Sequence, residues 1–361
     1  MFDIAILGLG IVGNGVFEVI KENTECISAL FGTTSTDGKA SINIKYVLDK
    51  REFKGHPLQD RVIQDFSKIL SDPCVSVVVE TMGGASPAFE FSKAALEAGK
   101  SVVTSNKEVV DKFGDILLET AAKNGVSYLY EASVGGGIPI IKPLENCFYS
   151  NKIIRIAGIL NGTTNFILSK MSEENMSLQT ALEISQKNGY AEANPNADLA
   201  GIDSARKICI LAGIAFGRFI PFDKITVIEG ITNVRADDFE LAKKAGYTIK
   251  LLAVAEMIGE NAKILVAPHL VKKGSLLSAV NEVFNAISVT GSTVGEVVFY
   301  GQGAGSKPTA SAVVTDVIEI LKSHPKAICR AKLEDGFLLP ENKFGDELVT
   351  LSNGSTYRIL K

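Results

Sequence analysis

The chain has 361 residues, 37 of them basic and 41 acidic, so its formal net charge is −4. This length suits two domains, since an ordinary domain has roughly 150 residues, and the balanced charge excludes a basic surface for nucleic acid or an anionic membrane. No uncharged apolar run reaches the roughly 18 residues of a membrane span, and no basic leader precedes the first apolar segment, so we expect a cytoplasmic protein.

The first 130 residues alternate short apolar runs with helical periodicity. We expect strands at residues 3–7, 42–48, 75–79, 101–104 and 127–130, and helices at residues 12–21, 87–98 and 107–123. Strands this apolar are typical of a sheet that is buried on both faces. Their alternation with helices predicts a parallel sheet with helices on both sides.

A glycine-rich turn follows the first predicted strand. The GxGxxG pattern ends a strand and opens a helix, the context in which it binds a dinucleotide. The first glycine permits the tight turn, the second lets the backbone approach the pyrophosphate, and the third allows close packing of helix on strand. The N-terminal part is therefore predicted to be a Rossmann-type doubly wound domain that binds a nicotinamide dinucleotide through Gly8, Leu9, Gly10, Ile11, Val12 and Gly13. A purely structural turn is the alternative.

Recognition of the adenosine ribose is expected at the end of the second strand. Asp49 takes the place of the acid that accepts from the ribose 2′-hydroxyl, although it stands further from Gly13 than the usual ~20 residues. The Gly-, Ser- and Thr-rich segment 32–41 accounts for the extra length. Asp49 favours NAD, whereas Lys50 and Arg51 offer charges for the 2′-phosphate of NADP. The choice of cofactor stays open, as does a simple charged turn.

The pattern changes after residue 133. A glycine-rich turn at 134–139 leads into a helix that ends near 148, a strand at 153–160 and helices at 163–171, 178–187 and 203–215. Strand-like runs at 249–257, 263–269, 283–290 and 294–300 predict a mostly antiparallel sheet, which makes this domain α+β. A helix at 309–321 is expected to return to the first domain. The polar tail from residue 332 reads as a hairpin or a loose extension.

The helix at 203–215 begins with a charged pair. Asp203 and Lys207 are four residues apart and share one helix face, while the rest of the helix is apolar nearly all round. The pair is therefore expected to face a cleft, with an ordinary surface ion pair as the alternative. The preceding loop adds Glu192. Two carboxylates and a lysine suit an amino-acid substrate and proton transfer to a carbonyl oxygen.

Five separated blocks resemble homoserine dehydrogenase. In chain order they read VVTSNKE, SVGGGIPIIKPL, GILNGTTNFIL, GYAEANPNADLAGIDSARK and FYGQGAGSKPTASAVV. The resemblance extends from residue 4 to about residue 321. It implies the reversible, NAD(P)H-dependent reduction of L-aspartate 4-semialdehyde to L-homoserine, in the branch that leads to threonine and methionine. It also implies a homodimer formed through the sheet of the second domain.

The resemblance assigns roles to individual side chains. It implies that Lys207 donates the proton to the aldehyde oxygen, that Glu192 and Asp203 bind the amino end of the substrate, and that Lys107 lies between cofactor and substrate. Thr163 is a further substrate contact. A packing role for Lys107 and a purely structural turn at 161–165, with Thr163 or Thr164 near the helix cap, are the alternatives.

The resemblance also assigns cofactor and cation contacts. The further cofactor contacts are Thr81, Ser105, Lys107, Gly189 and Gly303. The backbone of Glu131, Val134, Gly136 and Ile138 corresponds to a loop that binds a monovalent cation, expected to be sodium. A plain glycine turn is the alternative, because a site built from carbonyl groups leaves no side-chain pattern.

The predicted domains are residues 1–133, completed by a helix at 305–325, a substrate-binding and dimerisation domain at 134–304, and an extension at 326–361. Many bacterial members carry an ACT regulatory domain after the catalytic region, whereas about 40 residues follow Leu321 here. No ACT domain and no inhibition by threonine are therefore expected.

Two other functions fit the sequence less well. A phosphorylating semialdehyde dehydrogenase needs a cysteine nucleophile at a strand-to-helix turn, and the turn after residue 160 contains none. A dinucleotide sensor would not need Glu192, Asp203 and Lys207 together. The five cysteines include no CxxC pair and are expected to be reduced and mostly in the core, and the three histidines lack metal-ligand spacing.

Overall fold

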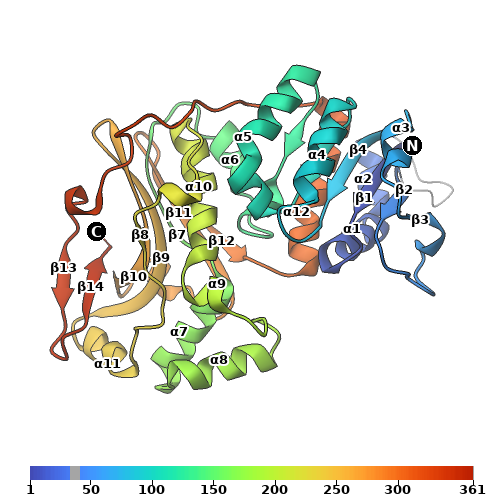
Figure 1. Ribbon diagram of the computed structural model, residues 1–361. Helices are drawn as coiled ribbons and strands as arrows, with labels where there is room; N and C mark the ends of the chain where they lie inside the picture. The colour runs from blue at the N-terminus through green and yellow to red at the C-terminus, as the bar shows by residue number, and fades with distance from the viewer. Residues whose placement is uncertain (33–40, 361) are drawn as a thin grey trace. The chain divides into compact units, whose positions relative to one another are not determined.

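The computed structural model describes residues 1–32 and 41–360, which form two compact units (Figure 1). Unit 1 comprises Met1–Pro139 and Ala304–Arg330, and unit 2 comprises Ile140–Gly303 and Ala331–Lys361. Each unit has its own sheet. Most of the Gly-, Ser- and Thr-rich segment that was expected to lengthen the loop before Asp49 lies outside the described residues.

Unit 1 contains a six-stranded parallel sheet, as predicted, in the order β3-β2-β1-β4-β5-β6. The strands are β1 (Phe2–Leu7), β2 (Ile42–Leu48), β3 (Val62–Ile63), β4 (Val75–Glu80), β5 (Ser101–Thr104) and β6 (Tyr128–Leu129). The strand order reverses between β1 and β4. In open α/β sheets, ligands bind beyond the carboxyl ends of the strands at such a reversal.

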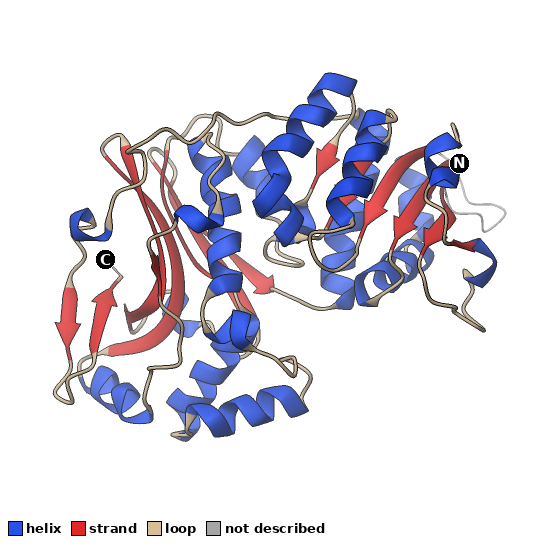
Figure 2. Cartoon of the chain, in the orientation of Figure 1, coloured by secondary structure: helices blue, strands red, loops and turns tan. Residues whose placement is uncertain are grey.

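Helices of unit 1 pack against this sheet (Figure 2). They are α1 (Ile11–Glu22), α2 (Thr24–Leu30), α3 (Ser67–Ser71), α4 (Ala88–Glu97), α5 (Lys107–Asn124) and α12 (Ser306–Ser323), with short 3₁₀ turns at Gln59–Arg61 and Glu131–Ser133. Ile4 and Ile6 form one core with the buried faces of α1 and α12. Gly15 permits this close packing, since a Cβ there would lie 2.7 Å from Ser306 Oγ.

Unit 2 is built on a larger, mostly antiparallel sheet, in the order β12-β11-β7-β9-β10-β14-β13, with β8 also paired to β10. Its strands are β7 (Ile153–Ile159), β8 (Val227–Ile228), β9 (Tyr247–Ile258), β10 (Asn261–Lys272), β11 (Phe284–Gly291), β12 (Gly295–Gln302), β13 (Leu348–Thr350) and β14 (Thr356–Ile359). β8 and β14 run parallel to β10, and the other pairs are antiparallel.

The principal helix of unit 2 is α10 (Ile202–Phe216), which packs on β7, β9 and β10. Ten of its residues are buried, which confirms the prediction of an apolar, buried helix. The other helices are α6 (Ile141–Asn146), α7 (Gly162–Glu174), α8 (Leu178–Lys187), α9 (Asn196–Leu199) and α11 (Ala236–Lys244), with 3₁₀ turns at Phe222–Lys224, Leu277–Ala279 and Glu341–Lys343.

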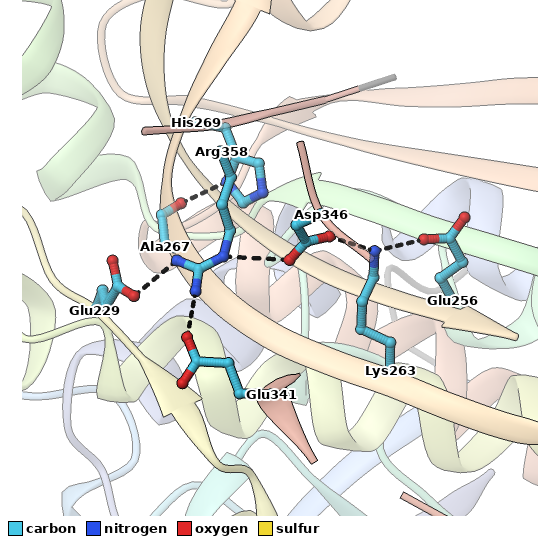
Figure 3. A network of polar contacts seen from close by, with 8 residues as sticks. All are labelled: Glu229, Glu256, Lys263, Ala267, His269, Glu341, Asp346 and Arg358. Atoms are coloured by element: carbon cyan, nitrogen blue, oxygen red, sulfur yellow. Dashed lines mark hydrogen bonds and ion pairs between the residues drawn. The ribbon is translucent and has the colours of Figure 1, made fainter. Parts of the chain in front are cut away.

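A network of ion pairs holds the C-terminal segment on the sheet (Figure 3). Arg358 on β14 donates to Asp346 at 3.2 Å, to Glu229 at 2.7 Å and to Glu341 at 2.7 Å. Lys263 on β10 contacts Asp346 and Glu256, each at 2.8 Å. The expected tail is therefore an ordered hairpin, because buried charges of opposite sign pair across it.

Most of the cysteines are exposed, although they were expected to lie in the core. Cys209 is buried, whereas Cys26, Cys74, Cys147 and Cys329 are exposed, and all five are free thiols. The expectation that they mostly fill the core is therefore wrong. Within residues 1–32 and 41–360, no helix combines the length and apolar character needed to cross a membrane.

Candidate functional site

The glycine-rich turn of unit 1 has the geometry of a pyrophosphate cradle. Gly8 has φ +90°, a value that side chains disfavour, and a Cβ at Gly13 would lie 2.1 Å from the carbonyl oxygen of Gly8. Gly10 is the N-cap of α1 without a side-chain cap, and nothing within 4 Å faces the position of its missing Cβ. The space beside Gly10 at the N-terminus of α1 is therefore open, as the approach of a phosphate to a helix N-terminus requires.

Asp49 reaches this turn from the end of β2. Its Oδ2 accepts the backbone N–H of Leu9 at 2.9 Å, and Arg51 donates to both carboxylate oxygens, at 3.0 and 2.8 Å. The hydrogen bond from the Arg51 side chain is the main cause that lowers the pKa of Asp49 to about 2. The Arg51 side chain is 61% exposed, so it is held by Asp49 but remains accessible.

Thr81, directly after β4, links the end of that strand to the glycine turn. Its hydroxyl donates to the carbonyl oxygen of Gly8 at 2.8 Å. The neighbouring Glu80 is fully buried and accepts the N–H of Met82 at 2.7 Å and the hydroxyl of Thr104 at 2.5 Å. Burial raises the pKa of Glu80 to about 7. Sequence reasoning missed Glu80, whose signal is a carboxylate closing an otherwise apolar strand.

Lys107 opens α5 directly after β5. The cap of this helix is Asn106, whose Oδ1 accepts the N–H of Val109 at 3.3 Å. The Asn106 amide also donates to the carbonyl of Gly84 at 2.7 Å, and the N–H of Ser105 donates to the carbonyl of Glu80 at 3.2 Å. These bonds fix the backbone that carries Ser105 and the half-buried Lys107 at the carboxyl end of the sheet.

The loop with the expected cation ligands begins at Glu131. The N–H of Glu131 donates to Asp316 at 2.9 Å, and the N–H of Ile138 donates to the carbonyl of Gly135 at 2.9 Å. Gly135 and Gly136 both have positive φ, 76° and 56°, so the chain reverses sharply. The described residues contain no group of three or more His, Cys, Asp or Glu side chains that could hold a metal ion.

In unit 2, Asp203 and Lys207 form a buried ion pair on α10. Lys207 Nζ lies 2.7 Å from Asp203 Oδ2 and donates to the carbonyl of Leu160 at 2.8 Å. The residues are 3% and 8% exposed, respectively. A lysine held between a carboxylate and a carbonyl oxygen keeps its ammonium in one place, which suits directed proton transfer.

Asn161 joins this pair to a further carboxylate, Asp198. The amide nitrogen of Asn161 donates to Asp198 Oδ1 and to Asp203 Oδ2, both at 2.8 Å. Asn161 also caps α7, since its Oδ1 accepts the N–H of Thr164 at 2.8 Å. The cap is therefore Asn161, and Thr164 lies next to it as expected. Neither Asn161 nor Asp198 was singled out from the sequence, although both lie in the quoted blocks.

The loop after α8 carries Glu192. The hydroxyl of Thr163 donates to the carbonyl of Tyr190 at 2.6 Å, which ties this loop to the start of α7. The Glu192 side chain is exposed, and the structure shows it no hydrogen bond to any described residue. Thr163 thus holds the loop, while the Glu192 carboxylate is not drawn into the cluster of Asn161, Asp198, Asp203 and Lys207.

Two glycines expected at the cofactor differ in their surroundings. Gly189 ends α8 with φ +75° and open space at the position of its Cβ. Gly303 follows β12, and a Cβ there would lie 1.9 Å from the buried amide of Asn285. Only glycine fits at residue 303 without displacing that amide.

Comparisons with known proteins agree over both units. The profile of the homoserine dehydrogenase family matches residues 139–318, and that of the homoserine dehydrogenase NAD binding domain matches residues 8–131. The homoserine dehydrogenase of Synechocystis is 41% identical over 329 residues, which cover 88% of this chain and 73% of the relative. That of Helicobacter pylori is 40% identical, covering 94% and 77%.

The chain belongs to the homoserine dehydrogenase family. It is an NAD(P)-dependent oxidoreductase that reduces L-aspartate 4-semialdehyde to L-homoserine. The structure of homoserine dehydrogenase from Thiobacillus denitrificans superposes with a TM-score of 0.87 at 36% identity, covering 94% of this chain and 79% of that one. A hyperthermophilic archaeal homoserine dehydrogenase in complex with NADPH gives a TM-score of 0.73 at 26% identity, covering 90% and 99%.

Proposed function

We propose that Lys207 is the general acid of this homoserine dehydrogenase. The observation that supports it is the buried ion pair with Asp203, with Nζ and Oδ2 2.7 Å apart. A paired carboxylate favours the ammonium form of lysine, which is the form that donates a proton. Negative charge builds on the aldehyde oxygen during reduction, and an ammonium within hydrogen-bond reach neutralises it.

Substrate binding is proposed to use the carboxylates around this lysine. Asp203 and Glu192 attract the ammonium group of the substrate, and Asp198 joins them because it shares the Asn161 amide with Asp203. Thr163 contributes by holding the loop that bears Glu192, through its bond to the Tyr190 carbonyl. The exposed Glu192 keeps the conformational freedom to swing onto a bound ligand.

The glycine turn of unit 1 is proposed to hold the cofactor, with the pyrophosphate on the N-terminus of α1 and the ribose at Asp49, Lys50 and Arg51. When bound, the reduced nicotinamide supplies the hydride to the aldehyde carbon. Thr81, Ser105, Lys107, Gly189 and Gly303 complete the contacts. The open position beside Gly10 supports this assignment, because a phosphate needs direct access to the backbone there. Both NADPH and NADH are expected to work.

A monovalent cation, sodium, is proposed to bind carbonyl oxygens of Glu131, Val134, Gly136 and Ile138. The consecutive left-handed glycines 135 and 136 support the proposal, because they reverse the chain in the middle of the residues that would supply the carbonyl groups. The cation would hold this loop in shape. Omitting sodium and potassium from the assay should lower the rate, and an unchanged rate would remove the cation from the proposal.

A cytoplasmic homodimer is also proposed. β12 is the last strand in the order of its sheet and carries an exposed Tyr300, and an edge strand of this kind readily pairs with a second copy. Four exposed free thiols fit a reducing compartment. Light scattering should report twice the mass of the chain, and the mass of a single chain would contradict the dimer.

The central experiment is Lys207→Ala, assayed by oxidation of NADPH with aspartate semialdehyde. We expect kcat to fall by about 10²- to 10⁴-fold, the range for a lost general acid, with cofactor binding near wild type. The matched control is Lys244→Ala, an exposed lysine on α11. If Lys207→Ala kept more than about a tenth of the wild-type kcat, the acid would be another group.

A further inference from the structure

We propose that Asn161 is a positioning residue for substrate binding, whose uncharged amide holds the carboxylates of Asp198 and Asp203 together. The proposal rests on the assignment of Asp203 and Lys207 to the substrate site. It concerns a side chain for which helix capping alone would be the ordinary explanation.

Contacts with Thr164 set the orientation of the Asn161 amide. Asn161 is 6% exposed and lies between the end of β7 and the start of α7. Its Oδ1 accepts both the N–H of Thr164, at 2.8 Å, and the hydroxyl of Thr164, at 3.0 Å. The capping interaction therefore determines which way the amide faces, and it directs the NH₂ group away from α7.

The NH₂ group of Asn161 contacts two carboxylates. It donates one hydrogen to Asp198 Oδ1 and one to Asp203 Oδ2, both at 2.8 Å, so both donors are used. The two aspartates lie 37 and 42 residues further along the chain, on α9 and at the start of α10. A single side chain thus sets the separation of two carboxylates from different helices.

An uncharged donor between the two aspartates has a chemical advantage over a cation. Two neighbouring carboxylates repel each other, and a cation placed on both would hold them but would also compete with an incoming ammonium group. An amide supplies two donors on one nitrogen and no net charge, so it brings the two acids together without adding a positive charge to the one that Lys207 already places on Asp203. Asp203 Oδ2 accepts from Lys207 as well, so the same amide also steadies the oxygen that orients the lysine.

Capping and positioning can be separated by substitution. Asn161→Asp keeps an oxygen that accepts the N–H of Thr164, as Asp is an equally good N-cap, but it removes both donors and adds a third negative charge. Asn161→Ser also keeps the cap and adds no charge, but its side chain is too short to bridge the aspartates. Ser177→Ala is the matched control, since it removes the cap of α8, where Ser177 accepts the N–H of Thr180 at 3.1 Å.

The measurements are KM for aspartate semialdehyde, kcat, the pH profile of kcat/KM and the melting temperature. We expect both Asn161 variants to raise KM at least about tenfold, the cost of a lost hydrogen bond to a charged group, with a smaller change in kcat. In Asn161→Asp the acidic limb of the profile should move to higher pH, because an added carboxylate raises the pKa of its neighbours. Ser177→Ala should change the melting temperature alone.

If both Asn161 variants kept KM within twofold of wild type and the same pH profile, Asn161 would be a helix cap only, and the inference would be overturned. Asp203→Asn distinguishes this failure from that of the proposed function. A raised KM in Asp203→Asn with unaffected Asn161 variants removes only the positioning role. Unaffected kinetics in all three, and in Lys207→Ala, would remove the substrate site itself.

Discussion

Unit 2 contains two aspartate–lysine pairs of nearly equal length, one buried and one half-buried at its aspartate, that are held in different ways. Asp203 and Lys207 are 2.7 Å apart, and Asp346 and Lys263 are 2.8 Å apart. The second pair is extended by charged partners, with Arg358 on Asp346 and Glu256 on Lys263 (Figure 3). In the first pair, Asp203 accepts from the neutral Asn161 amide and Lys207 donates to the neutral Leu160 carbonyl.

The difference shows what each network stabilises. In the second pair, both residues have further charged partners. The free energy of these ion pairs therefore contributes to attaching the C-terminal hairpin to β10. Hydrogen bonds with neutral groups fix the positions of Asp203 and Lys207 without adding a further charge, which suits a site that must respond to a charged ligand. Equivalent substitutions in the two pairs should therefore affect different observables.

The largest expected effect is on catalysis, from Asp203→Asn. The change keeps the shape of the side chain but removes the charge that orients Lys207 and attracts the substrate ammonium. We expect kcat/KM to fall by at least about 100-fold, the lower end for impaired general acid catalysis, with a modest change in melting temperature. The assay is NADPH oxidation with aspartate semialdehyde. A loss of stability with unchanged kcat/KM would show that this pair, too, serves the fold.

The equivalent change in the second pair, Asp346→Asn, should act on stability. It removes the carboxylate that Lys263 and Arg358 share, although both keep other acidic partners, so the loss is that of hydrogen bonds between charged groups, about 1.5–3 kcal/mol. We expect the free energy of unfolding in urea to fall by about that amount, while kcat/KM stays within twofold. Asp335→Asn, at an exposed aspartate of the same segment, is the control. A similar loss in both variants would contradict the role of the network.

A buried carboxylate without a charged partner among its hydrogen bonds extends the comparison to unit 1. Burial raises the pKa of Glu80 from 4.5 to about 7. The native state therefore keeps a proton that the unfolded chain loses. The associated stability is fully present below pH 4.5 and is lost as the pH rises through about 7.

Glu80→Gln stays neutral at every pH and keeps an acceptor for the N–H of Met82. Relative to wild type, we expect its free energy of unfolding to increase from pH 4.5 to 7 and then level off, by up to roughly 3 kcal/mol. Urea unfolding across this range is the measurement, with the exposed Glu119→Gln on α5 as the control. A difference that does not vary with pH would mean that Glu80 is not the titrating group.

Features made by residues close together in the sequence could be predicted from it, whereas contacts between residues far apart in the sequence could not. The glycine turn at 8–13 and the pair at 203 and 207 are local patterns, so their periodicity and spacing carry the information. The bridge from Asn161 to Asp198 and Asp203, and the bond from Arg358 to Glu229 over 129 residues, exist only after the sheet of unit 2 has formed. The prediction that most cysteines are buried was wrong because a free thiol is tolerated both in the core and on the surface of a protein.

The smallest expected effect concerns cofactor choice at Asp49, Lys50 and Arg51, where the basic partner of a charged pair is exposed. Arg51 binds Asp49 through two hydrogen bonds, and 61% of its side chain is accessible to a ligand, against 8% of the Asp49 side chain. A 2′-phosphate would bind Arg51 and Lys50, whereas a 2′-hydroxyl needs only Asp49.

We expect the double substitution Lys50→Ala and Arg51→Ala to weaken NADPH binding by roughly tenfold or more and to leave NADH binding little changed. Titration of cofactor fluorescence gives both dissociation constants, and Lys54→Ala, at the exposed lysine nearby, is the control. Equal losses for the two cofactors would mean that the basic residues support the turn around Asp49 and do not recognise the phosphate. The pair of Asp49 and Arg51 would then have a structural role, like the network around Arg358.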